Sequence, residues 1–157
     1  MWKVFELTDL PKGRKVIKNR WLFDVKQDNR KKARLVAKGF SQVGGIDFNE
    51  IFSPVVRFET VRLMLALSSL EDWYIEALEV KTTFLYGKLD EEIYIHQPEG
   101  FKVKGQENKV LRLHRALYGL KQAALSWWRE LEASMKRLGF GCTTSDASMF
   151  FTKKVKQ

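Results

Sequence analysis

The sequence predicts an α+β fold, because two kinds of apolar periodicity occur in separate parts of the chain. Residues 21–37 alternate with period two, as in a strand pair, whereas residues 122–138 repeat at helical spacing. Strands and helices do not alternate in the regular order of a parallel βαβ sheet. With 157 residues, 45% of them apolar, the chain is long enough for one core and too apolar to be disordered.

Residues 20–38 are predicted to form a β-hairpin. Positions 21–25 alternate between apolar or aromatic and other side chains, and the turn formers of residues 27–30 follow. Period two gives the second strand an apolar face with Ala33, Leu35 and Ala37. The other face carries Val36 and three cations, Lys32, Arg34 and Lys38.

Two helices are expected, one from a Thr60 cap to Leu70 and one from Gln122 to a stop at Gly139. The second has apolar positions on one face, at Ala124, Trp128, Leu131, Met135 and Leu138. Short strands are expected over 73–81, 93–96, 110–113 and 149–152, and a short turn or helix over 82–86.

Charge is segregated along the chain. The formal net charge is +8 over residues 1–40, −7 over 41–100 and +8 over 101–157. Such a layout favours a polyanion-binding surface, and the acidic middle could hold a cation. A solvated basic surface around an ordinary core is the alternative reading, and composition leaves it open.

Several classes of protein are excluded by composition. The single Cys142 rules out an intramolecular disulfide framework and a cysteine-based zinc site. No apolar run approaches the roughly 18 residues of a membrane span, and the N-terminus has no signal-peptide apolar region. We therefore expect an intracellular protein without a membrane partner, and cytoplasm and nucleus both remain open.

Five stretches carry a resemblance to a known family. They are KARLVAKGFSQ from Lys32, FSPVVRFETVR from Phe52, LEVKTTFLYGKLDEEIY from Leu78, QPEGF from Gln97 and LYGLKQAALSW from Leu117. In this order they resemble the reverse transcriptase domain of copia-type (Pseudoviridae-like) LTR retrotransposons. The resemblance runs from about residue 2 to the end and covers part of the family domain.

The resemblance implies the fingers and partial palm of a right-hand polymerase. In this picture residues 1–58 and 88–120 are fingers-like, whereas residues 59–87 and 121–157 are palm-like. The family extends a primer with dNTPs on an RNA or DNA template, with carboxylates that hold two Mg²⁺ ions. The resemblance also implies that residues at positions matching the family motifs contact the dNTP or the template, namely Lys32, Arg34, Phe84, Tyr118 and Gly119.

The catalytic set implied by the resemblance is incomplete. Glu79 stands where the family has its first catalytic, metal-binding aspartate, and the other two lie in a Tyr-x-Asp-Asp hairpin. No Asp-Asp pair occurs in this sequence. Thr83, Tyr86, Ala124 and Leu125 also depart from the family pattern. We therefore expect a chain that is inactive on its own.

Two other interpretations stay open at this stage. The chain could be a non-enzymatic nucleic-acid-binding relic, or a transposon remnant that folds poorly because half a palm leaves sheet edges and apolar faces uncovered. Self-association through such a surface is a further expectation.

Overall fold

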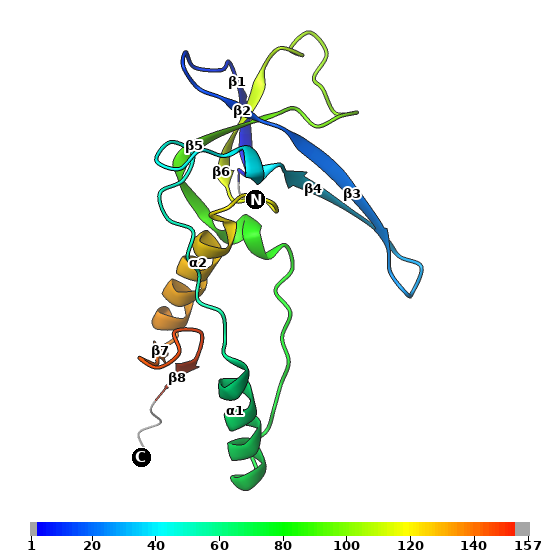
Figure 1. The fold of residues 1–157 in the computed structure, drawn as a ribbon. Coiled ribbons are helices and arrows are strands. Elements are labelled where there is room, and N and C mark those ends of the chain that lie inside the picture. Colours follow the sequence, from blue (N-terminus) through cyan, green and yellow to red (C-terminus); the bar gives the residue numbers. More distant parts are fainter. Residues whose placement is uncertain (1–2, 153–157) are drawn as a thin grey trace.

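The computed structural model describes residues 3–152 and has a mixed α/β architecture (Figure 1). Its largest sheet has the strand order β1-β6-β5-β2, formed by Phe5–Thr8, Val110–Arg115, Lys88–His96 and Val16–Ile17. Strand β6 is antiparallel to both β1 and β5, and β2 is parallel to β5. The strands expected at 93–96 and 110–113 are confirmed. Strands β1 and β2 were not predicted, because so few residues show no clear alternation.

The predicted hairpin is confirmed. Strand β3 (Asn19–Val25) pairs antiparallel with β4 (Lys31–Ala37), and Asn29 takes a positive φ of 59° in the turn. The hairpin projects away from the large sheet (Figure 1), so both of its faces reach solvent. Lys38 lies beyond the end of β4, before the 3-10 helix η1 (Gly39–Ser41), so it is not a third cation of the β4 face.

The core lies on the large sheet and the segments that follow β6. It is made of buried apolar side chains from β2, β4, β5, β6, the segment that follows β6 and the start of the second helix: Ile17, Ala37, Ile93, Ile95, Leu111, Leu113, Ala116, Leu117, Leu120 and Ala123. The 3-10 helix η2 (Thr83–Tyr86), which confirms the expected turn over 82–86, packs Phe84 and Leu85 against this core.

Helix α2 spans Ala123–Arg137 and ends as predicted. Gly139 has a φ of +83°, and the N–H of Phe140 donates to the Met135 carbonyl at 2.9 Å, as in a Schellman motif. The predicted apolar face was wrong at its two ends, since Ala124 and Leu138 are exposed. The first turn instead buries Ala123, Leu125 and Ser126, because it packs against η2 and β5.

Helix α1 (Phe58–Leu70) begins earlier than predicted. Its N-cap is Arg57, and Thr60 does not cap it. The Thr60 hydroxyl donates to Asp146 Oδ2 at 2.7 Å, and the Arg57 N–H donates to the same oxygen at 3.0 Å. Asp146 is only 7% exposed, and these hydrogen bonds hold its pKa below the ordinary value of a carboxyl group. A carboxylate from the turn between β7 (Gly141–Cys142) and β8 (Phe150–Phe151) therefore supplies the cap.

The strand expected over residues 73–81 is wrong. This segment is irregular and exposed, because no strand among residues 3–152 lies beside it to complete its backbone hydrogen bonds. It returns from α1, which lies apart from the large sheet (Figure 1). Together they expose apolar side chains that include Leu63, Leu65, Leu70, Trp73, Tyr74, Ile75 and Leu78. The strand expected at 149–152 is confirmed as β8.

Candidate functional site

The base of the β3–β4 hairpin lies directly against the backbone of residues 117–120. The N–H of Ala37 donates to the Tyr118 carbonyl at 2.8 Å. A Cβ on Gly119 would lie 2.1 Å from the Ala37 carbonyl oxygen, and one on Gly39 would lie 2.0 Å from the Gly119 carbonyl oxygen. Gly119 also has a φ of +88°. Only glycine fits both the approach and the conformation at residue 119.

Two predicted aromatic residues meet beside this contact. The rings of Phe84 and Tyr118 lie edge to face, with centroids 4.6 Å apart and an interplanar angle of 69°. Phe84 comes from η2 and Tyr118 from the segment after β6, so the fold joins parts of the chain 34 positions apart. The structure thus brings Phe84, Tyr118 and Gly119 together at the hairpin base.

A buried polar network holds the loop after β4 to the start of α2. Gln122 is 2% exposed; its Oε1 accepts from Gln42 Nε2 at 2.9 Å, and its Nε2 donates to the Asp47 carbonyl at 2.8 Å. Gln42 Oε1 in turn accepts from the Lys121 N–H at 2.8 Å. Sequence reasoning missed this network, because glutamines give no burial signal on their own.

Lys32 and Arg34 lie on the same face of β4, away from the hairpin base. Arg34 Nη1 is 4.0 Å from Asp24 Oδ2, across the strand pair. Lys32 lies opposite Asp24 in the register, and no ion pair involves it in the part of the chain that is described. Arg20 lies opposite Val36 in the register and therefore on the same face, so the ribbon presents three cations and one carboxylate there. Lys153, Lys154 and Lys156 of the basic C-terminal third lie outside the described residues.

Glu79 is separate from these residues. It lies in the exposed, irregular segment 73–81, and among residues 3–152 no three His, Cys, Asp or Glu side chains converge as metal ligands. A lone exposed carboxylate does not fit a two-Mg²⁺ centre, which needs several carboxylates. The described residues therefore do not form the metal site that the resemblance implies, and no metal-dependent step follows from them.

Comparisons with known proteins agree with the sequence motifs. A family model described as "Reverse transcriptase (RNA-dependent DNA polymerase)" matches residues 2–156. The chain is 46% identical over 154 residues to "Retrovirus-related Pol polyprotein from transposon TNT 1-94" of Nicotiana tabacum, covering 95% of this chain and 12% of that protein. It is 42% identical over 142 residues to "Retrovirus-related Pol polyprotein from transposon RE1" of Arabidopsis thaliana, covering 87% and 10%.

The chain therefore belongs to the reverse transcriptase family, and its relatives are Pol polyproteins of copia-type retrotransposons. It spans about a tenth of the length of these relatives. No solved structure matches it significantly. Across residues 3–152, none of the helices has the length and apolar character needed to cross a membrane.

Proposed function

We propose that this chain forms the fingers and the first part of the palm of a right-hand reverse transcriptase. In this assignment residues 1–58 and 88–120 belong to the fingers, and residues 59–87 and 121–157 to the palm. Family membership over residues 2–156 supports the proposal. So does the projecting β3–β4 hairpin, whose base is fixed to the segment after β6.

The chain binds a template–primer and an incoming dNTP through the hairpin and its base. Lys32 and Arg34 contact phosphates, for which ammonium and guanidinium groups are suited. Phe84, Tyr118 and Gly119 line the nucleotide and template pocket. The observation that carries this proposal is the contact of Phe84 with Tyr118 next to Gly119. This contact lies at the end of β4, the strand that bears Lys32 and Arg34.

The chain does not polymerise on its own, because in the described part of the chain Glu79 has no group of companion carboxylates that could hold Mg²⁺ with it. Even with such companions, a Glu for Asp change moves the carboxylate by about 1 Å, and misplacement on this scale can cost about a hundredfold in rate. Non-enzymatic nucleic-acid binding is then the activity that the chain retains.

Primer extension tests the inactivity. We expect no extension of an oligo(dT) primer on poly(rA) with Mg²⁺ or Mn²⁺ above the level of the Glu79→Ala chain, since the catalytic carboxylates are incomplete. A Glu76→Ala chain, which changes another carboxylate of the same segment, is the matched control. Extension that Glu79→Ala abolishes and Glu76→Ala preserves would contradict the proposal.

We also propose that the apolar surface of α1 and residues 73–78 is covered by a second copy of this chain. A surface with so many exposed apolar side chains is typical of an interface. Sedimentation velocity should show concentration-dependent dimers that Leu63→Glu in α1 disrupts. Leu138→Glu, an exposed leucine at the end of α2, should leave the dimers intact. A monomer at every concentration would contradict this.

A further inference from the structure

The outer edge of β3 is a strand edge without a partner. Strand β3 pairs only with β4, and among residues 3–152 no third strand lies beside it. The Lys38 N–H donates to the Lys18 carbonyl and the Lys26 N–H to the Arg30 carbonyl, at 2.7 and 3.0 Å. Because hydrogen-bonded pairs alternate along an antiparallel ladder, the backbone groups of residues 19, 21, 23 and 25 point away from β4. Within the described chain these groups make no backbone hydrogen bond on that side.

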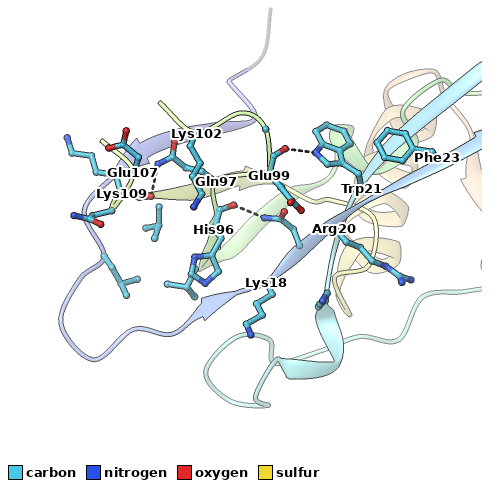
Figure 2. A pocket seen from close by; sticks show the side chains of 17 residues that line it. Lys18, Arg20, Trp21, Phe23, His96, Gln97, Glu99, Lys102, Glu107 and Lys109 are labelled. Carbon is cyan, nitrogen blue, oxygen red and sulfur yellow. Dashed lines mark hydrogen bonds between the residues drawn. The ribbon is translucent and has the colours of Figure 1, made fainter. Parts of the chain in front are cut away.

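The loop 97–109 approaches β3 through an aromatic side chain rather than through the backbone. Trp21 Nε1 donates to the Glu99 carbonyl at 3.1 Å, and the ring centroids of Trp21 and Phe101 lie 5.4 Å apart. Trp21 and Phe23 lie on one side of β3 and Arg20 on the other (Figure 2). A cleft of about 1020 Å³ lies between the first half of β3 and this loop, so the loop does not fill the space beside the strand.

Strand β3 has few of the features that protect an edge strand. Proline, bulges and lysines are the usual protection. Residues 19–25 contain no proline, glycine or lysine, and their register with β4 is continuous. Phe23 and Val25 are 77% and 62% exposed. Strand β4 differs, because it carries three cations and its Ala37 N–H already donates to the Tyr118 carbonyl. The open edge is therefore that of β3.

The sequence of β3 is complementary to itself when two copies run antiparallel. A two-fold axis at Leu22 places Arg20 opposite Asp24 of the second copy and Trp21 opposite its Phe23, and each pair occurs twice. The members of each pair share a face of the strand, because side chains alternate with period two. Trp21 and Phe23 also bear outward backbone groups, so the two residues can exchange N–H···O bonds across the axis. Charge, aromatic and backbone pairing therefore agree in one register.

Other registers lose this agreement. Moving the axis by one residue puts Arg20 opposite Lys26 in one direction and opposite Leu22 in the other. A corresponding pairing of two β4 edges about Arg34 would place that guanidinium opposite its own copy, and like charges directly opposite are destabilising. Charge complementarity thus selects both the strand and the register.

We propose that β3 pairs edge to edge with β3 of a second copy of this chain, with the two-fold axis at Leu22, and joins the two hairpins into one four-stranded antiparallel sheet. Among residues 3–152 Arg20 takes part in no ion pair, and Asp24 has only a long one, 4.0 Å from Arg34 Nη1. Both are exposed and free to pair across the axis. The inference goes beyond the proposed function, and the edge of β3 is separate from the apolar surface of α1 and residues 73–78.

Disulfide cross-linking tests the register on the full chain. Leu63→Glu removes the proposed α1 interface, and Cys142→Ser removes the native thiol. In this background Leu22→Cys places two thiols at the axis, where the Cα atoms of such a pair lie about 4.5 Å apart, and mild oxidation should give a covalent dimer. Val25→Cys is the matched control: Val25 is more exposed than Leu22, but its two copies would be about 20 Å apart, so it should not cross-link.

Charge reversal tests the Arg20–Asp24 pair by sedimentation velocity in the Leu63→Glu background. Arg20→Asp and Asp24→Arg each set like charges opposite one another, and each should raise the Kd of the dimer by about tenfold. An equimolar mixture of the two variants should form dimers again, because opposite charges then face each other at both pairs. Lys12→Asp makes the same change in net charge at an exposed residue outside the hairpin and should leave the Kd unchanged. Circular dichroism melts confirm that each variant stays folded.

Several results would overturn the pairing. Equal cross-linking of Leu22→Cys and Val25→Cys would reveal random collision or another register. A mixture of the folded Arg20→Asp and Asp24→Arg chains that stays monomeric would show that these residues do not meet, and an equal loss in Lys12→Asp would show a general effect of charge. A monomer at every concentration in the Leu63→Glu background would refute the β3 dimer and leave the proposed function standing, since that function rests on other residues.

Discussion

Replacing Gly119 with alanine is expected to lower the free energy of unfolding by about 3 kcal/mol or more. Two costs add at this residue. Its φ of +88° is unfavourable for any residue with a Cβ, and that Cβ would lie 2.1 Å from the Ala37 carbonyl oxygen. The obstacle is backbone at the end of β4, so the hairpin base has to move away from Tyr118. Urea denaturation followed by circular dichroism measures the loss.

Two other glycines separate these costs. Gly13 has a φ of +83° with nothing within 4 Å of its Cβ position, so Gly13→Ala reports the conformational strain alone, about 1 kcal/mol. A Cβ on Gly39 would meet the Gly119 carbonyl oxygen at 2.0 Å, and Gly39→Ala therefore reports the steric cost. A Gly119→Ala chain no less stable than Gly13→Ala would show that the hairpin is not held against residues 117–120.

Gln122→Leu is expected to destabilise the chain by about 2–3 kcal/mol, although leucine is apolar and similar in size. The substitution removes the acceptor for Gln42 Nε2 and the donor at 2.8 Å from the Asp47 carbonyl. Both groups stay buried and keep only the long hydrogen bond of 3.5 Å between them. A buried polar group that loses its partner costs more than the hydrogen bond itself contributed. The midpoint of urea denaturation provides the measurement.

The exposed Gln27 of the hairpin turn is the matched control for this change. Gln27→Leu is expected to stay within about 0.5 kcal/mol of the unaltered chain, since its side chain reaches solvent. Hydrogen exchange adds a local readout: the amides of residues 39–48 should exchange faster in Gln122→Leu. Equal stability of the two variants would mean that the glutamine network does not fasten this loop to α2.

Local patterns were enough to predict the hairpin and α2 from sequence. Period two with turn formers indicated β3 and β4, and helical spacing with Gly139 indicated α2 and its end. The segment 73–81 has the composition of a strand but is irregular. A strand also needs a neighbouring strand for its backbone hydrogen bonds, and the pattern of the segment alone does not show whether one is present. Thr60 was misread for a related reason: the group that caps α1 is Asp146, 89 residues from Arg57.

The candidate site was partly accessible from sequence. Phe84, Tyr118 and Gly119 were identified by resemblance, and their proximity is a result of the fold. The cleft along Trp21 and Phe23 was not predicted, since its other side comes from residues 96–109. Glu79 was identified by its position in the family motif, and among residues 3–152 it belongs to no group of three or more His, Cys, Asp or Glu side chains that could hold a metal ion.

Affinity for an RNA–DNA hybrid across a salt series tests the central claim most directly. We expect a log–log slope steeper than about −3, because several phosphates are contacted, and a loss of about one unit in Lys32→Ala and in Arg34→Ala. Lys88→Ala, outside the hairpin, should keep the full slope. A flat response from a chain that unfolds cooperatively, or equal slopes in all three variants, would contradict the claim that the hairpin of this reverse transcriptase fragment binds the template–primer.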